Sequence, residues 1–151
     1  MVKGPVHRLR KHADYQRVYG SSRKQFAKQM SYFFSVRPET GRDGRALRVA
    51  DPLSPRVGLT VGKVMGKAVD RNRIKRRMRE VVRRNLSLLP ESVDVILHPR
   101  RGVIDLDFAV LEREVAGVFR SVDRMVRRDE RQRELAGAKA SAEAQSETGL
   151  S

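Results

Sequence analysis

The segment from Val69 to Leu86 restricts this chain more than any other, because apolar residues recur in it at helical spacing among a dense set of arginines and lysines. On a helical wheel that advances about 100° per residue from Ile74, four residues lie within roughly 80° of it: Met78, Val81, Val82 and Asn85. The opposite side and its flanks are polar and almost wholly cationic, with Asn72, Arg73, Lys75, Arg76, Arg77, Arg79, Arg83 and Arg84. We predict a helix with one face in a core and a basic face turned outward.

The basic face is too unbalanced to be explained by solvation alone. Glu80 can pair with only one or two of the arginines near it, and the others have no acidic partner within the helix. A solvated helix face normally mixes charges of both signs. Arginine, whose planar guanidinium suits phosphate oxygens, outnumbers lysine on this face, and the whole chain carries a formal net charge of +15. The face is therefore interpreted as a binding surface for a polyanion, with nucleic acid as the first candidate.

Composition argues against several other kinds of function. No apolar run approaches the length of a transmembrane helix, and the N-terminal residues lack the apolar stretch of a secretory signal, so we expect a cytoplasmic protein without a membrane partner. The absence of cysteine removes disulfides, thiolate catalysis and cysteine-ligated metals. The histidines, His7, His12 and His98, are too scattered to predict a metal site. Neither a metal bound by the protein nor a small-molecule substrate is expected.

The remaining patterns predict a single α+β domain over residues 1–128. Besides the basic segment, helical spacing predicts a short helix over Arg8–Tyr19 and an amphipathic helix that begins near Asp105 or Asp107 and ends around Arg128. Alternating or β-branched runs predict strands: two short ones within Gln25–Arg37, with a bend at Lys28 and Gln29, and one each over Arg56–Gly62 and Ser92–His98. Residues 38–55 are predicted to form a flexible loop and residues 129–151 a disordered tail. This order gives a sandwich with helices on one sheet.

A resemblance to a known family sharpens this picture. The stretch RVGLTVGKVMGKAVDRNRIKRRMRE, residues 56–80, closely resembles the bacterial ribonuclease P protein component, whose signature is a strand, a Lys/Gly turn and an R-N-R helix start. The likeness extends to LRKHADYQRVY, residues 9–19, and to DVILHPR, residues 94–100, but leaves out the loop and the tail. It implies a two-layer α+β sandwich like a ribosomal-protein domain, in the order α-β-β-β-α-β-α, with a left-handed crossover contrary to the ordinary handedness rule.

The resemblance also implies a function and a set of contacts. In this family the protein assists a catalytic RNA that uses Mg²⁺ to remove the 5′ leader of precursor tRNA, so Mg²⁺ is held by RNA and no catalytic residue is expected in the protein. The residues implied to contact the RNA subunit are Lys63, Lys67, Arg71, Asn72, Arg73, Lys75, Arg76 and Arg79. A cleft between the first helix and the sheet is implied to hold the single-stranded leader through Arg10, Lys11, Tyr15, Tyr19 and Phe34, since stacking on aromatic rings tolerates varied sequence.

Departures and alternatives accompany this interpretation. Val64 stands where the family often has lysine, which removes one cation, whereas Tyr15 and Tyr19 stand where phenylalanine is common and keep a stacking face. Core packing is the simpler explanation for such aromatic residues. A structural ribosomal-type RNA-binding protein would show the same fold and charge. An independent protein nuclease is less well supported, because acidic residues suited to a metal are sparse and Asp105 with Asp107 fits a helix start.

Overall fold

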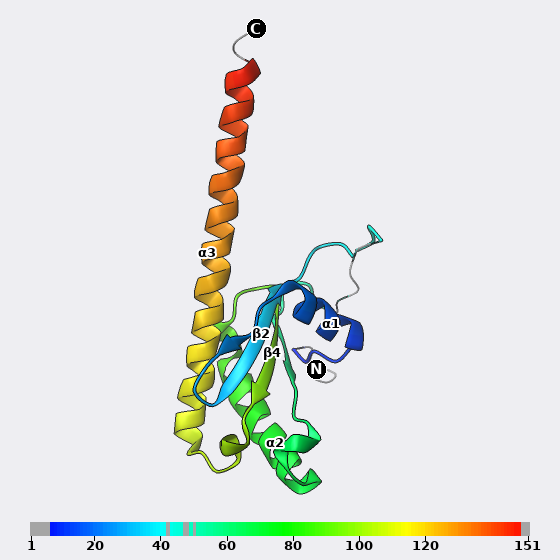
Figure 1. The fold of residues 1–151 in the computed structure, drawn as a ribbon, viewed down its shortest axis with the longest axis vertical. Helices are drawn as coiled ribbons and strands as arrows, with labels where there is room; N and C mark the ends of the chain where they lie inside the picture. Colours follow the sequence, from blue (N-terminus) through cyan, green and yellow to red (C-terminus); the bar gives the residue numbers. More distant parts are fainter. Residues whose placement is uncertain (1–6, 42, 47–48, 50, 149–151) are drawn as a thin grey trace.

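A four-stranded sheet with the strand order β1-β2-β4-β3 forms the centre of the computed structural model, which describes residues 7–41, 43–46, 49 and 51–148 (Figure 1). The strands are β1 (Gln25–Phe26), β2 (Met30–Val36), β3 (Arg56–Leu59) and β4 (Val93–Pro99). β2 is antiparallel to both of its neighbours, and β3 is parallel to β4. The predicted pair of short strands with a bend between them is confirmed. β3 ends earlier than predicted, because the chain turns at Gly62 into a short 3-10 helix.

Three α-helices complete the fold: α1 (His12–Ser21), α2 (Ala68–Asn85) and α3 (Phe108–Thr148). Short 3-10 helices lie at Lys63–Met65, Leu86–Leu88 and Arg101–Ile104. The predicted order α-β-β-β-α-β-α is confirmed. α1 starts later than the predicted Arg8, because the residues before it run along β3: the amide of Leu9 donates to the carbonyl of Val57 at 3.1 Å, and the amide of Val57 donates to the carbonyl of His7 at 2.7 Å.

The two faces of the sheet carry different helices. Val93, Val95 and Leu97 of β4 join the main core with α2 and α3, whereas Ile96 points the other way and packs with Leu9 and Val18 beneath α1. This division follows from the alternation of side chains along a strand. The α+β sandwich is thus confirmed, with α1 covering the face that α2 and α3 leave open.

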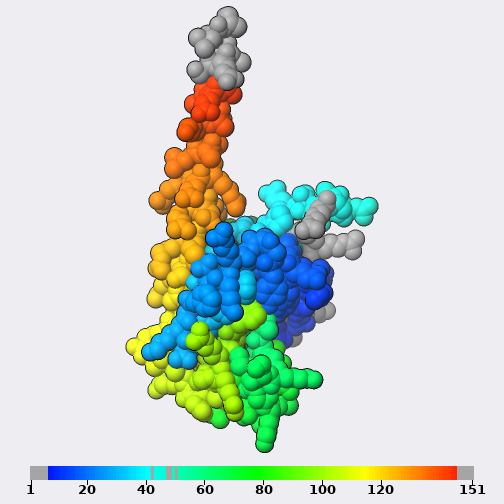
Figure 2. Space-filling model, in the orientation of Figure 1, coloured from blue at the N-terminus to red at the C-terminus, as the bar shows by residue number. Residues whose placement is uncertain are grey.

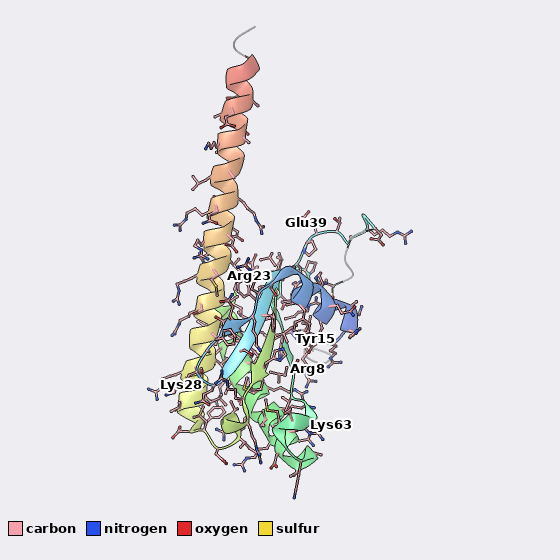
Figure 3. All side chains as sticks on the ribbon, in the orientation of Figure 1. Arg8, Tyr15, Arg23, Lys28, Glu39 and Lys63 are labelled. Carbon is pink, nitrogen blue, oxygen red and sulfur yellow. The ribbon has the colours of Figure 1, made fainter. Side chains whose placement is uncertain are left out.

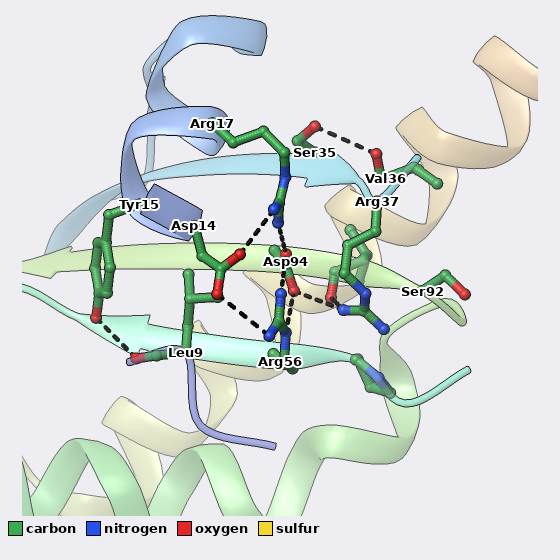
Figure 4. A network of polar contacts seen from close by, with 12 residues as sticks. Leu9, Asp14, Tyr15, Arg17, Ser35, Val36, Arg37, Arg56, Ser92 and Asp94 are labelled. Carbon is green, nitrogen blue, oxygen red and sulfur yellow. Dashed lines mark hydrogen bonds and ion pairs between the residues drawn. The ribbon is translucent and has the colours of Figure 1, made fainter. Parts of the chain in front are cut away.

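α2 is the connection between the parallel strands β3 and β4, and it lies on the face of the sheet away from α1 (Figure 4). This is the left-handed crossover that the resemblance implied. All of the residues predicted to face the core are buried: Ile74, Met78, Val81, Val82 and Asn85. Gly66 precedes the helix with a φ of 121°, a conformation that favours glycine. The basic face is therefore held outward by a fully buried apolar stripe.

α3 begins where it was predicted to begin but extends well beyond its predicted end. Its start is capped by Asp107, whose Oδ1 accepts a hydrogen bond from the amide of Ala109 at 2.9 Å. The prediction that the helix ends around Arg128 and that residues 129–151 are disordered is wrong for residues 129–148, which continue the helix; residues 149–151 lie outside the described residues. Side chains from Arg127 to Gln145 are all exposed, and this part of α3 projects as an arm (Figure 2). Alanine, glutamate and arginine favour a helix without burial, which a prediction based on apolar content misses.

Candidate nucleic-acid interface

The outward face of α2 carries cations that the rest of the fold does not neutralise. Arg73, Arg76 and Arg79 are exposed, as is Asn72, and Lys75 is half-buried. Among the residues that the structure describes, no carboxylate forms an ion pair with Arg73, Lys75, Arg76 or Arg79. We call these four residues the free cations of α2. Crowding of like charges at this spacing costs stability, so the arrangement is better suited to binding than to folding.

Other arginines of α2 form ion pairs or hydrogen bonds within the protein. Glu80 pairs with Arg83 at 2.6 Å and with Arg84 at 3.1 Å, which confirms that it can serve only two of its neighbours. Hydrogen bonds from these two arginines lower the pKa of Glu80. Arg77 donates to the carbonyls of Ile104, at 2.9 Å, and of Leu106, so it ties α2 to the turn before α3. α2 therefore carries two kinds of arginine: those held by contacts within the protein, and those that belong to the free cations.

The helix start presents further predicted contacts. Lys63 is exposed there (Figure 3), as is Lys67, and Arg71 is half-buried. The Nε atom of Arg71 is buried and has no hydrogen-bond partner in the described part of the chain. Val64 exposes 87% of its surface. The start of α2 thus offers cations on an open surface beside two exposed apolar residues, Val64 and Val69.

A cavity of about 500 Å³ lies between α2, Tyr15 and the segment that precedes α1. Its lining combines an apolar floor with a cationic rim and a single acid: His7, Arg8, Leu9, Arg10, Tyr15, Val57, Leu59, Lys75, Arg76, Arg79, Glu80, Val82 and Arg83. Burial, followed by the charges of Arg8 and Arg10, lowers the pKa of Arg79. The cavity joins the two groups of residues predicted separately, because Arg10 and Tyr15 share it with Lys75, Arg76 and Arg79.

Aromatic rings line the face of the sheet beneath α1. The Tyr19 ring lies 6.4 Å from Tyr15 and 4.9 Å from Phe33, the latter edge-on, and the Phe33 ring lies 5.5 Å from His98. The Tyr19 hydroxyl is 2.9 Å from Nε2 of His98 and 3.4 Å from Oγ1 of Thr60. We call Tyr15, Tyr19, Phe33 and His98 the aromatic row. Tyr19 keeps 38% of its surface exposed and is open to a ligand.

Tyr15 is the more firmly held ring of the row. Its hydroxyl donates to the carbonyl of Leu9 at 3.2 Å, and burial, then the neighbouring Tyr19, raises its pKa. A Cβ atom at Gly58 would lie 2.3 Å from the Tyr15 hydroxyl oxygen, so glycine on β3 is what makes room for the ring. Lys11, by contrast, is exposed at the residue before α1. The predicted leader residues Arg10, Lys11, Tyr15 and Tyr19 therefore lie together at one end of α1 and along it.

Phe34 is not part of this group, which corrects the sequence prediction. It packs against the main core on the face that carries α2 and α3, while Phe33 points beneath α1. The reason is strand alternation, which places adjacent residues on opposite faces. The signal was present in β2: Met30, Tyr32, Phe34 and Val36 form one uninterrupted apolar set, and Ser31 and Ser35 flank Phe33 on the other. The more polar set marks the face with room for a ligand.

A buried acid that sequence reasoning did not single out fixes α1 on the sheet. Asp94 of β4 is fully buried and accepts hydrogen bonds from Arg37 at 2.6 Å, from Arg56 at 2.9 and 2.8 Å, and from Arg17 of α1 (Figure 4). Asp14 of α1 adds contacts to Arg17 at 2.7 Å and to Arg56 at 3.4 Å. We call these five residues the Asp94 network. It positions α1, and with it Tyr15 and Tyr19, over the sheet.

The described residues contain neither a cluster of metal-binding side chains nor a membrane-spanning helix. No group of three or more histidine, aspartate or glutamate side chains is arranged to hold a metal ion in the part of the chain that the structure describes. Within the same residues, no helix combines the length and the apolar character needed to cross a membrane.

Comparisons with known proteins agree with this geometry. A sequence profile of the family described as Ribonuclease P matches residues 5–123. The ribonuclease P protein component of Finegoldia magna is 42% identical over 65 residues, and that of Chromohalobacter salexigens is 45% identical over 75 residues. The matched segments cover 43% and 49% of this chain, and each covers 58% of the relative, so the chain spans a little over half the length of these relatives.

Solved structures show the same architecture. The RNase P protein of Staphylococcus aureus superposes with a TM-score of 0.58 at 26% identity, over 74% of this chain and 91% of that one. The RNase P protein of Thermotoga maritima gives the same TM-score, 0.58, at 23% identity, over 76% of this chain and 96% of that one, a likeness that concerns the fold alone.

Proposed function

We propose that this chain, which belongs to the ribonuclease P protein component family, acts in tRNA processing as the protein subunit of a ribonuclease P ribonucleoprotein. In this role it binds the catalytic RNA subunit and the 5′ leader of precursor tRNA. It assists the Mg²⁺-dependent cut that yields the mature 5′ end. The observation that supports this most strongly is the set of free cations on α2 beside a cavity that also contains Arg10 and Tyr15.

The RNA subunit is assigned to the outward face of α2. Each phosphate that a free cation neutralises releases counterions from the RNA, which favours binding and makes it depend on salt. Guanidinium groups can also contact two phosphate oxygens at once. Arg73, Arg76 and Arg79 are exposed, and no carboxylate in the described part of the chain pairs with them, so they can turn to the RNA without breaking an ion pair there.

The leader is assigned to the space between α1 and the sheet. A leader of varied sequence needs contacts that every base can make, and stacking on aromatic rings provides them. Tyr19 is exposed enough to stack, and Phe33 and His98 support it from the sheet. Arg10 and Lys11 supply positive charge for the leader backbone near the start of α1.

Chemistry is assigned to the RNA. Mg²⁺ is held by the RNA subunit and the substrate, and no protein side chain is given a catalytic role. Positive charge from the protein lowers repulsion between the two RNAs, so less Mg²⁺ is needed to bring them together. We place the complex in the cytoplasm, where tRNA is processed in bacteria.

A cleavage assay tests this function. Precursor tRNA is incubated with the cognate RNA subunit over a range of Mg²⁺ concentrations, with and without the chain. We expect the chain to shift cleavage to lower Mg²⁺ and to tighten substrate binding. No effect on either would refute the proposal. Cleavage by the chain without RNA would instead indicate a protein nuclease.

A second measurement separates the role in ribonuclease P from a structural role in the ribosome, which the same fold and charge allow. The tagged chain is fractionated from a lysate on a sucrose gradient, and its RNA is identified in each fraction. We expect it with the ribonuclease P RNA. Co-sedimentation with ribosomes would favour the ribosomal role.

A further inference from the structure

Phe26, the second residue of β1, exposes 69% of its surface, an unusual position for a large aromatic ring. It pairs with Ser31 of β2, and Ser31 in turn pairs with His98 of β4. Side chains that are directly opposite each other in antiparallel strands point to the same face. Phe26 therefore lies on the face that carries α1, in line with His98 and diagonal to Phe33.

Lys24 accompanies Phe26. Its ammonium group stands 5.6 Å from the centroid of the Phe26 ring, within the range of a cation–π contact. The pKa of His98 is lowered first by burial of its ring and then by the positive charge of Lys24. Lys24 therefore also lies near the aromatic row. The pair thus places a ring and a cation at the outer end of the row formed by Tyr15, Tyr19, Phe33 and His98.

Other exposed apolar side chains do not combine these features. Val64 and Leu135 are exposed by 87% and 65%, but neither has a ring on which a base can stack. β1 is an edge strand of the sheet and only two residues long, and within the described residues no strand pairs with its outer side. The ring is therefore exposed at an edge of the sheet, on the face that carries α1.

We propose that Phe26 and Lys24 form an additional nucleotide position at the edge of the sheet, which takes one unpaired base of the leader. This inference rests on the proposed function of the aromatic row. The Phe26 ring stacks on the base, and the Lys24 ammonium contacts the adjacent phosphate. Because every base has a face that can stack, the position reads leader length and not leader sequence. It extends the row from the centre of the sheet to its edge.

The test measures the affinity of the assembled complex, the chain with its cognate RNA subunit, for precursor tRNAs whose leaders are lengthened one nucleotide at a time. For wild type, affinity should rise with leader length and then level off. Phe26→Ala should level off at a shorter leader and bind long leaders about 10-fold more weakly. For substrate that lacks a leader, Phe26→Ala should have the same affinity as wild type. Phe26→Trp should keep wild-type affinity, and Leu135→Ala serves as a control of similar exposure.

Each remaining outcome decides the matter. If Phe26→Ala matches wild type at every length while Tyr19→Ala weakens long leaders, the edge position is wrong and the proposed function stands. If Phe26→Ala weakened binding equally at every leader length, and also for substrate without a leader, Phe26 would have a structural role and the inference would be overturned. If leaders add no affinity even for wild type, both the proposed leader contact and this position fall. Thermal unfolding of Phe26→Ala, expected to match wild type for so exposed a side chain, verifies that the variant is folded.

Discussion

Two groups of arginines in this molecule have opposite surroundings. Arg17, Arg37 and Arg56 converge on Asp94, whose side chain is 0% exposed, whereas Arg73, Arg76 and Arg79 stand on the outside of α2 and pair with no carboxylate of the residues that the structure describes. The partners in the first group are distant in sequence: Arg56 and Arg17 are separated from Asp94 by 38 and 77 residues. The role of an arginine in this protein therefore depends on whether the fold places an acidic side chain beside it.

The difference has an energetic side. Burying charges carries a large desolvation cost, so the Asp94 network is tolerated only while every member keeps its partners. The free cations of α2 carry no such constraint, and their mutual repulsion makes the unbound protein slightly less stable. One group should therefore matter for folding and the other for binding.

The largest effect is expected from Asp94→Asn. It leaves three arginines around a neutral group, and breaking a buried ion pair in this way costs about 3–5 kcal/mol of the free energy of unfolding. Denaturant unfolding measures this. Asp123→Asn, which breaks a pair on the surface of α3, should cost less than about 1 kcal/mol and serves as the control. A loss for Asp94→Asn no larger than that of the control would contradict the structural role of the network.

The next effect concerns the free cations. The double variant Arg76→Ala with Arg79→Ala should bind the RNA subunit at least about 10-fold more weakly, and the slope of log affinity against log salt should fall by about 2, since two phosphate contacts are lost. Its free energy of unfolding should not decrease.

Filter binding over a range of salt gives the slope. The matched control, Arg83→Ala with Arg84→Ala, removes the same charge from the same helix, but from arginines that Glu80 already holds. Equal losses for the two double variants would show that pairing within the protein has no bearing on RNA binding.

A smaller effect is expected from simple anions. Sulfate or phosphate that binds the free cations of the folded chain should raise the free energy of unfolding by about 1 kcal/mol at concentrations several times the dissociation constant. Unfolding in sulfate is compared with unfolding in chloride at matched ionic strength. The gain should shrink in Arg79→Ala. Equal stability in both salts would count against an anion site on this face.

The smallest effect is expected from removal of residues 129–151. Because the side chains from Arg127 to Gln145 are exposed, little packing is lost, and the free energy of unfolding should change by less than about 0.5 kcal/mol. Helical signal in circular dichroism should fall, since the arm is helical. A large loss of stability would mean that the arm supports the fold.

The sequence allowed the basic helix to be predicted well. Ile74, Met78, Val81, Val82 and Asn85 are all buried as their angles indicated, because a single helix obeys one period whatever surrounds it. The free cations followed from the same angles and from the scarcity of acids nearby. What could not be predicted is which arginines are paired across the fold, since Asp94 is a long way along the chain from Arg17 and Arg56.

Errors arose where a choice between two local possibilities depended on tertiary contacts. Phe33 and Phe34 are adjacent, and only the packing of β2 decides which one points beneath α1. Leu9 falls within the segment predicted to be helical, yet the pairing of its backbone with Val57 keeps it outside α1. The arm of α3 was missed for the opposite reason. There, intrinsic helix propensity extends the helix although the side chains of the arm are exposed.

Site-directed RNA cleavage tests whether the free cations of α2 contact the RNA subunit. The chain has no cysteine, so a single engineered one gives a unique point of attachment for an iron–EDTA reagent. Asn72→Cys places the reagent among the free cations of α2, and Ala138→Cys places it on the arm of α3, both at exposed positions. We expect strong, localised cleavage of the ribonuclease P RNA from position 72 and little from position 138. Cleavage from the arm with none from α2 would contradict this expectation.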